Sequence, residues 1–318
     1  MRIRFGYVSQ ALSLWDASSS KTITFTNWRK LGKEERIPRL VEIAKVNIRN
    51  TKRAVLYNIA HEMELYRLSS SIVPLATHPE VNWNYLSDLL EDLQDLGDYI
   101  KAYKLRVSFH PNQFTLFTSD RSEVTLNAVR DMEYHFNLLN AMGIADESLL
   151  NIHVGGAYGN KLEAIKRFNE NIKLLPTSIK NRMTLENDDK TYTLTETLAV
   201  CTDHKIPLLF DYHHHMANPC EKSLEEILPE VFQTWEHFGL IPKVHISSPK
   251  NEKQFRHHSD FVSLEFIMPF LTLAKSIGTD FDIMIEAKEK DRAALKLVED
   301  ISSIRGVKRV SGGSVFWK

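Results

Sequence analysis

Short apolar runs alternate with longer amphipathic segments along the whole chain. Eight runs have the length of a buried strand: 2–8, 65–71, 105–111, 149–156, 183–188, 207–213, 242–248 and 282–288. Between them, apolar residues recur at i, i+3, i+4 and i+7, which predicts amphipathic helices. These helical segments fall near 36–62, 86–103, 123–143, 160–175, 193–204, 223–237, 263–277 and 291–303.

This alternation predicts a parallel sheet, because a parallel connection needs a crossover long enough to hold a helix. Eight such units in 318 residues predict an α/β fold, a (β/α)8 TIM barrel. A doubly wound open sheet is the alternative, but it usually carries a glycine-rich phosphate loop after its first strand. The stretch GYVSQALS, which begins at Gly6, does not supply that loop.

Composition supports one large domain. Apolar residues make up 43% of the chain, and Gly and Pro are scattered without forming a linker, so we expect a single domain over residues 1–318. A net charge of −1 argues neither for nor against nucleic acid, since a local basic groove is compatible with it. Cys201 and Cys220 are too few for a disulfide framework, and no signal core or long apolar stretch is present. We therefore expect a cytoplasmic protein without a membrane segment.

A polar insert, residues 9–36, follows the first predicted strand. It carries Trp15, Phe25 and Trp28 among Arg29, Lys30 and Lys33. One interpretation is a surface loop anchored by its aromatic residues. Aromatic side chains among cations also suit stacking on nucleobases beside a phosphate backbone, and the pattern leaves both interpretations open.

Ligand-type residues end six consecutive predicted strands, at the barrel rim where such folds carry their chemistry. In chain order they are His110, His153, Glu186, Asp211, His245 and Glu286, with Lys243 beside His245 and His257 and His258 in the next loop. Any one of them alone is more often a hydrogen-bonded rim residue or a helix cap. So many imidazoles and carboxylates in one mouth need metal ions to compensate their charge and desolvation. The sequence therefore predicts a polynuclear metal site.

The run FDYHHHMAN, residues 210–218, fits this site in a particular way. Along a strand, Asp211 and His213 would share a face and His214 would point away. If the backbone turns after the strand end, an Asp-x-x-His pair brings both side chains to one ion. We favour Asp211 and His214 as ligands and expect His213 and His215 to be neighbouring or rim groups.

A histidine-rich donor set indicates Zn²⁺ or Mn²⁺ and favours hydrolysis over sugar isomerisation, whose ligands are mostly carboxylates. Several ions held close together suit phosphodiester hydrolysis, in which one activates water and others offset charge on the phosphate. A glutamate that bridges two ions can hold that water between them. We assign this role to Glu186.

The motifs HPNQF, NIHVGG, LENDD, FDYHHH, KVHIS, HSD and EAKEKD, in this order, resemble the UV damage endonuclease family, which is itself similar to endonuclease IV. The resemblance covers nearly the whole chain. It implies an enzyme that nicks damaged double-stranded DNA immediately 5′ of cyclobutane pyrimidine dimers, 6-4 photoproducts and some abasic sites, leaving a 3′-hydroxyl. It further implies manganese, two or three ions with Mg²⁺, Co²⁺ or Zn²⁺ as alternatives, and no ATP. We expect a monomer.

By position, the resemblance assigns the metal ligands to His110, His153, Glu186, Asp211, His214, His245, His258 and Glu286. Lys243 matches a lysine that the family can carry carboxylated near the metals, which would make it catalytic together with Glu186. The alternative is a rim lysine paired with a carboxylate.

Three further residues are implied to contact the lesion. Gln113 and Phe114 match a pair that the family wedges into the duplex, where an intercalating side chain offsets the cost of base flipping. Many relatives have tyrosine in place of Phe114; phenylalanine keeps the stacking face but lacks the hydroxyl, which puts any hydrogen bond at this position in doubt. Tyr7 matches a residue near the flipped dimer, or else packs at the barrel mouth.

Three other functions are weighed against this one. An apurinic-site nuclease of the endonuclease IV type fits the metals, but the Gln113–Phe114 pair and the stretch YRLSSS argue against it. A sugar isomerase or epimerase would act on free sugars and not bind DNA. A non-catalytic lesion-binding protein would be expected to lack ligands, whereas every matching position here is filled.

Overall fold

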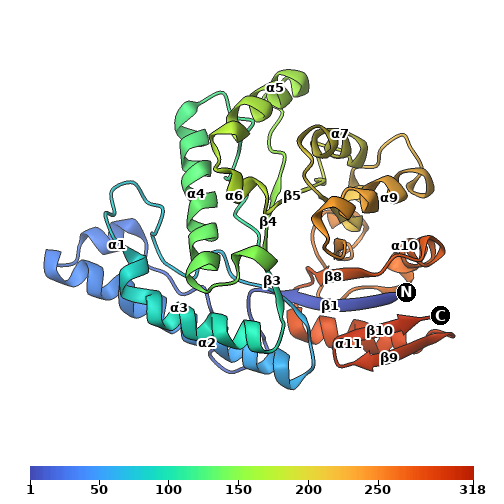
Figure 1. Cartoon of the computed structure of the whole chain (residues 1–318), viewed down its shortest axis with the longest axis horizontal. Helices are drawn as coiled ribbons and strands as arrows, with labels where there is room; N and C mark the ends of the chain where they lie inside the picture. Colours follow the sequence, from blue (N-terminus) through green and yellow to red (C-terminus); the bar gives the residue numbers. More distant parts are fainter.

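Eight parallel strands close into a barrel in the computed structural model, which describes residues 1–318 (Figure 1). The strands are β1 (Arg2–Val8), β2 (Leu65–Arg67), β3 (Arg106–Phe109), β4 (Leu149–His153), β5 (Met183–Glu186), β6 (Leu208–Asp211), β7 (Lys243–Ile246) and β8 (Phe281–Ile285). Each pairs with the next, and β8 and β2 both pair with β1, which closes the ring. The predicted TIM barrel is confirmed.

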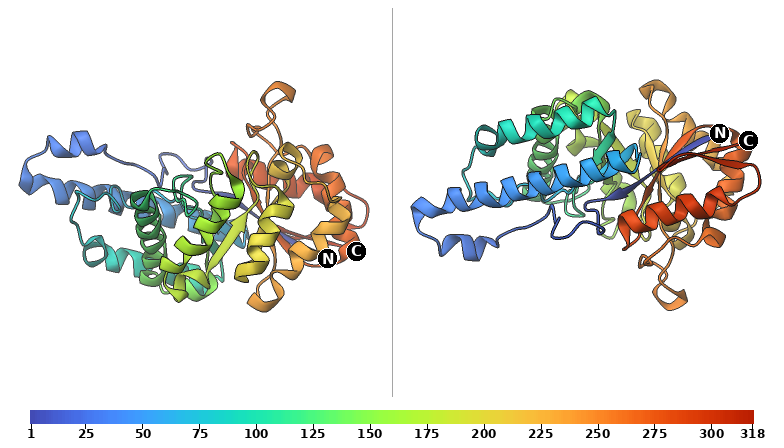
Figure 2. Two further views of the ribbon diagram at one scale, coloured as in Figure 1. Left: turned by 90° about the horizontal axis from the view of Figure 1, so that it is seen from above. Right: turned by 90° about the horizontal axis from the view of Figure 1, so that it is seen from below.

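All eight predicted helices surround the barrel. They are α2 (Lys33–Ala60), α3 (Tyr85–Ala102), α4 (Ser122–Ala141), α5 (Lys161–Asn171), α7 (Leu194–His204), α9 (Leu224–Gln233), α10 (Leu264–Ile277) and α11 (Lys290–Ser302). Local signals define their starts: Thr193 with Glu196 and Ser223 with Glu226 form capping boxes that satisfy the first amides of α7 and α9. Figure 2 shows α2 extending well beyond the strands.

The sequence reasoning did not predict the short helical segments. These are α1 (Phe25–Arg29), α6 (Thr177–Lys180), α8 (Tyr212–Ala217), and the 3₁₀ turns η1 (Ala145–Glu147), η2 (Ile172–Leu174), η3 (Glu236–Phe238) and η4 (Glu252–Gln254). Segments of three to six residues are too short to show a helical period, so hydrophobic spacing cannot reveal them.

A C-terminal hairpin, β9 (Val307–Ser311) and β10 (Ser314–Trp317), was also not predicted. Strand β2 is short and pairs with β1 only at Gly6–Val8. The first half of β1 therefore has no parallel partner on that side. β10 fills this place by pairing antiparallel with Arg2–Arg4. Gly6 permits the close approach of β2, because a Cβ there would lie 2.6 Å from the carbonyl oxygen of Leu65.

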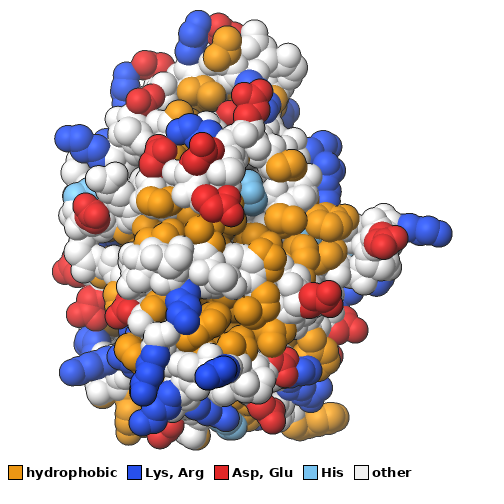
Figure 3. All heavy atoms as spheres, turned by 90° about the vertical axis from the view of Figure 1, so that its right-hand side faces the viewer, with side chains coloured by type: hydrophobic (Ala, Val, Ile, Leu, Met, Phe, Trp, Pro, Cys, Tyr) orange, Lys and Arg blue, Asp and Glu red, His pale blue; other side chains and the backbone are white.

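The core lies mainly between strands and helices, where 72 buried apolar residues form one cluster. The N-terminal end of the barrel interior instead holds Asp282, which is fully buried and accepts bonds from Arg4 Nε at 2.7 Å and Arg106 Nη1 at 2.5 Å. On the face near both termini, apolar side chains gather in the middle with charged ones around them (Figure 3). None of the helices is both long and apolar enough to cross a membrane.

Candidate metal centre

Seven of the eight predicted ligands converge at the C-terminal rim of the barrel. They form three groups: His110, His153 and Glu186; Glu186, Asp211 and His214; Asp211, His245 and Glu286. Within each group, one donor atom from each residue lies within 4.8 Å of the others. Glu186 and Asp211 each belong to two groups, so the three form one continuous site.

Strand register produces this convergence. His153, Glu186 and Asp211 are the last residues of β4, β5 and β6. His153 lies opposite Glu186 in the ladder between β4 and β5, and Asp211 lies opposite His245 between β6 and β7. Because residues of adjacent parallel strands at the same level point to the same side, each pair presents its donors together.

The turn after β6 explains the Asp-x-x-His spacing. Asp211 is the N-cap of α8, and its Oδ1 accepts the backbone N–H of His214 at 2.8 Å. This first helical turn brings His214 Nδ1 to 3.8 Å from Asp211 Oδ2 and 3.4 Å from Glu186 Oε1. The predicted arrangement of this pair is thus present.

The other two histidines of the run lie outside the three groups. Both ring nitrogens of His213 are engaged, Nδ1 with Ser247 Oγ and Nε2 with the Phe255 carbonyl, each at 2.6 Å. Burial lowers the pKa of His213 to about 4, so its ring is neutral near pH 7. His215 packs against Phe210 with ring centroids 5.8 Å apart. Both residues hold the turn in place.

His258, the eighth predicted ligand, lies beside the centre. Its Nδ1 is 2.6 Å from the Glu286 carbonyl oxygen, and its ring centroid is 6.5 Å from that of His214. It belongs to none of the three groups, so its role as a ligand stays a prediction.

Burial and neighbouring charges act in opposite directions on the pKa values at this site. Burial raises the pKa of Glu186, but the imidazoles of His245 and His153 outweigh this effect and hold the pKa well below its usual range. Burial raises the pKa of Asp211. For His214, burial lowers the pKa, yet the carboxylates of Asp211 and Glu186 raise it well above 6.5.

Two orphaned atoms indicate that the site is built for cations. Asp211 Oδ2 and His153 Nδ1 are buried without a hydrogen-bond partner. Buried polar atoms are nearly always satisfied, and a lone pair without a donor is what a metal ion requires. The donor set of imidazoles and carboxylates therefore fits divalent Mn or Zn.

Lys243 lies inside the barrel two residues before His245. It is 1% exposed, and its Nζ donates to Ser108 Oγ at 3.1 Å. Burial, reinforced by the cation of Arg106, holds the pKa of this amine well below 10.5. Lys243 forms no ion pair with a carboxylate, which contradicts the alternative of a paired rim lysine.

Sequence reasoning missed three residues that hold the ligands. The Arg67 guanidinium at the end of β2 pairs with Glu286. Asn151 donates to the Glu186 carboxylate and accepts from Thr184 Oγ1 at 2.8 Å. Asn187 exchanges two bonds of 2.9 Å with the Asp211 backbone. A signal existed for Asn151, which faces inward two residues before His153, and for Arg67, a charged residue within the predicted strand 65–71.

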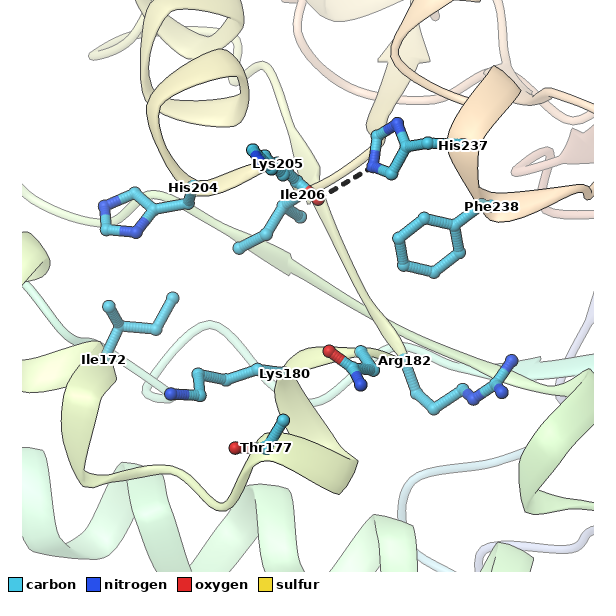
Figure 4. A pocket seen from close by; sticks show the side chains of 10 residues that line it. Ile172, Thr177, Lys180, Arg182, His204, Lys205, Ile206, His237 and Phe238 are labelled. Carbon is cyan, nitrogen blue, oxygen red and sulfur yellow. Dashed lines mark hydrogen bonds between the residues drawn. The ribbon is translucent and has the colours of Figure 1, made fainter.

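A polar cavity of about 320 Å³ adjoins the centre at His110 and Arg67. Its wall also includes Ser9, Gln10, Ser20, Ser69, Ser70, Ser71 and Lys290. A larger cavity of about 590 Å³ lies near α6 and α7, where Lys180, Arg182 and His204 line it and His237 Nε2 is 3.0 Å from the Lys205 carbonyl oxygen (Figure 4). No carboxylate lines this larger cavity, and none of the three ligand groups lies there.

Comparison with known proteins decides the family. A sequence profile described as UV-endonuclease UvdE matches residues 3–318. The chain belongs to this family. Two proteins named UV DNA damage endonuclease, from Bacillus cereus (strain 03BB102) and Bacillus mycoides (strain KBAB4), are each 60% identical to it over 317 residues, which is 100% of both chains. The predicted family is confirmed.

Solved structures agree with this UvdE family assignment. The crystal structure of SacUVDE matches with a TM-score of 0.83 and 32% identity, covering 95% of this chain and 100% of that one. Endonuclease IV from Thermus thermophilus matches with a TM-score of 0.56 and 12% identity, covering 93% and 98%. A D-tagatose 3-epimerase-like protein matches at 0.55 and 15%, covering 94% and 96%. The last two likenesses show a shared fold alone.

The UvdE resemblance places two elements at the lesion, the turn with Gln113 and Phe114 and the residue Tyr7, and only the turn is exposed. After β3, the backbone N–H of Phe114 donates to Asn112 Oδ1 at 2.8 Å and that of Thr115 to the Asn112 carbonyl at 3.0 Å. This turn leaves Gln113 exposed and Phe114 71% exposed. Both side chains are therefore accessible to a ligand.

The position of Tyr7 favours the packing alternative over a contact with the lesion. Its side chain is fully buried, donates from its hydroxyl to Asn58 Oδ1 at 2.7 Å, and packs on Tyr66 with ring centroids 5.4 Å apart. The reason is strand parity: Arg4, whose guanidinium reaches Asp282, faces the barrel interior, so Tyr7, an odd number of residues along β1, faces the surrounding helices. Tyr7 is a packing residue.

Proposed function

We propose that this chain is a UV damage endonuclease that hydrolyses the phosphodiester immediately 5′ of cyclobutane pyrimidine dimers, 6-4 photoproducts and some abasic sites, using two or three divalent ions and no ATP. The observation that carries the proposal is the continuity of the three ligand groups through Glu186 and Asp211. The 60% identical relatives named for this activity support it. The 72-residue core supports one catalytic domain over residues 1–318. We propose that it acts as a monomer.

The ligand groups suggest how the chemistry is divided. Divalent ions bound there, Mn²⁺ in our proposal, would activate water and offset negative charge on the phosphate. Glu186 would be shared between two ions and keep them a fixed distance apart. Asn151 orients one oxygen of Glu186, and Arg67 orients Glu286, so the donors are held before any ion arrives.

Lys243 fits a carboxylated lysine. Carboxylation joins the neutral amine to CO₂ with loss of one proton, and the depressed pKa supplies the neutral amine. The nearby Arg106 and Arg4 would stabilise the resulting anion. The modification predicts a mass increase of one CO₂ in a gently ionised sample and a carbamate signal with ¹³C-labelled CO₂, both lost in Lys243→Met.

Lesion recognition is proposed for Gln113 and Phe114. Their exposed turn and the polar cavity beside His110 lie on the same rim, so one could enter the duplex while the other receives displaced bases. Gln113→Ala with Phe114→Ala should reduce discrimination between damaged and intact duplex. Phe316→Ala is the matched control, since this 42% exposed aromatic lies on β10 at the opposite end of the barrel. Unchanged discrimination in the double variant would refute the wedge.

The deciding experiment is a nicking assay with Mn²⁺. End-labelled duplexes would carry one thymine dimer, one abasic site or no damage. We expect a cut immediately 5′ of the dimer, abolished by chelator and by Glu186→Gln. Cutting of the abasic duplex alone would indicate an activity of the endonuclease IV type instead. No cutting of any duplex would refute the proposed function.

A further inference from the structure

Trp15 stands apart from every other large apolar side chain. It is 90% exposed, whereas the remaining tryptophans, Trp28, Trp83, Trp235 and Trp317, are at most 9% exposed. Its two aromatic neighbours in the insert are packed: Phe25 stacks on His78 with centroids 3.9 Å apart, and Trp28 is buried. The aromatic residues of the insert therefore divide into anchors and one free indole. A single exposed apolar residue means little by itself, so the argument rests on how the loop is held.

The flanks of the loop around Trp15 are fastened by buried polar side chains. Asn47 on α2 is fully buried and clamps Lys21, accepting its N–H and donating to its carbonyl, both at 2.8 Å. Asp291 on α11 is also fully buried and accepts the N–H of Leu12 at 2.5 Å and of Ser13 at 3.2 Å. Burying such groups costs free energy unless they are bonded, so these contacts fix the loop strongly.

The backbone at Trp15 itself is also fixed. Arg53 donates to the carbonyl of Trp15 at 2.8 Å and to that of Asp16 at 3.2 Å. Asn50 donates to the Ser18 carbonyl at 2.9 Å. Asp16 has a φ of 43°, in the left-handed region where Asp and Asn are enriched among non-glycine residues. The chain thus turns tightly here and presents the indole to solvent on a rigid support.

The loop also reaches the proposed active site. Ser9, Gln10 and Ser20, on either side of Trp15, line the polar cavity that contains His110 and Arg67. Loops after barrel strands meet at the C-terminal rim, so Trp15 lies on the rim where the metal centre lies.

Positively charged side chains contact the backbone of the same loop. Besides Arg53, Lys290 Nζ is 3.5 Å from the Val8 carbonyl and Arg292 Nη2 is 3.3 Å from the Leu12 carbonyl. A flat aromatic face beside positive charges matches a nucleobase beside its phosphates. DNA is also the ligand of this rim under the proposed function.

We propose that Trp15 is a second aromatic contact with DNA, stacking on a nucleobase separately from Phe114. The inference rests on the proposed function, because that function makes DNA the ligand of this rim. Stacking of one base on an aromatic side chain corresponds to about a 5- to 150-fold change in Kd. We expect Trp15→Ala to weaken binding of the dimer-containing duplex by a factor in this range and Trp15→Phe to retain most of the affinity.

The test measures binding in chelator, so that no strand is cut. Fluorescence anisotropy with a labelled duplex gives Kd for the full chain, for Trp15→Ala, for Trp15→Phe and for Phe316→Ala as the matched control. Because Trp15 is the one exposed tryptophan, acrylamide quenching of intrinsic fluorescence reports on it directly. DNA should protect this fluorescence in the full chain, and the protectable component should be missing from Trp15→Phe.

A Kd for Trp15→Ala within twofold of the unaltered chain, or quenching unchanged by DNA, would overturn the inference. Loss of binding in Phe316→Ala as well would also overturn it, since the effect would then not depend on the rim. If the unaltered chain nicks the dimer duplex while Trp15→Ala binds normally, only this inference fails. If no duplex is nicked yet DNA protects Trp15, the proposed reaction fails and the DNA contact stands.

Discussion

Replacing Glu186 with Gln is the most informative change to the metal centre. The substitution preserves size and hydrogen-bonding shape but removes the one carboxylate shared by the first two ligand groups. His110 Nε2 lies 3.1 Å from Glu186 Oε2, and His245 Nδ1 lies 3.1 Å from Glu186 Oε1. Glu186 is 1% exposed. In the variant, the two imidazoles therefore face a buried neutral amide. A metal ion bound there would lose the negative charge of the carboxylate.

The expected magnitude follows from this burial. Removing one partner from a buried charge pair costs about 3–5 kcal/mol. At 1.36 kcal/mol per factor of ten, this corresponds to a decrease of about 10²- to 10⁴-fold in the affinity for the ions that share Glu186. Binding of damaged DNA in chelator should change little, because Gln113, Phe114 and the loop of Trp15 are untouched.

The assay separates the two consequences. Nicking of the dimer duplex is measured across a Mn²⁺ titration for the unaltered chain, for Glu186→Gln and for Glu170→Gln, an exposed glutamate on α5 that serves as control. We expect Glu186→Gln to show no cutting at the Mn²⁺ concentrations that support nicking by the unaltered chain, whereas Glu170→Gln behaves normally. Turnover by Glu186→Gln within threefold of normal at low Mn²⁺ would refute its role as a shared ligand.

Three further predictions concern stability, thiols and pH. Asp282→Asn leaves Arg4 without its buried anion and should lower the free energy of unfolding by about 3–5 kcal/mol in urea titration; a loss under about 1 kcal/mol would contradict the argument. Native protein should react with one equivalent of a thiol reagent, at Cys220, because Cys201 is buried and its pKa is raised by burial; two equivalents before denaturation would be contrary. A metal ion must displace the proton of His214, whose pKa is raised above 6.5, so Mn²⁺ affinity should rise with pH up to that pKa and then level off; constant affinity from pH 6 to 8 would exclude this linkage.

The barrel topology and the convergence of most of the candidate ligands could be predicted from the sequence because both depend on regular spacing. Strand-length runs and helical periods define the alternation, and parallel strands then bring their last residues to one rim. Glu186 and His153 are adjacent because their strands are neighbours in register. No side-chain detail is needed for that conclusion.

The rest depends on contacts between segments distant in sequence. The partnership of Arg67 with Glu286 joins residues 219 positions apart, and nothing local to either one announces it. The hairpin β9–β10 follows from the shortness of β2, which leaves half of β1 unpaired. The burial of Tyr7 likewise depends on the face of β1 that it occupies and on its contact with Asn58, 51 positions away.

The polar interior of the barrel connects its two ends electrostatically. Arg4 and Arg106 both pair with Asp282, and Arg4 also lies 3.5 Å from Glu64, which pairs with Arg2 as well. These three guanidiniums therefore face two carboxylates, and one positive charge is in excess below Lys243. This excess positive charge, together with burial, disfavours protonation of the Lys243 amine and so explains why its pKa is lowered. The same field would favour an anion at that position, as a carboxylated lysine would be. The ion pairs around Asp282 therefore have a second effect besides stabilising the N-terminal end of the barrel. They favour a neutral or carboxylated Lys243 over a protonated one, just below the candidate ligands of the rim.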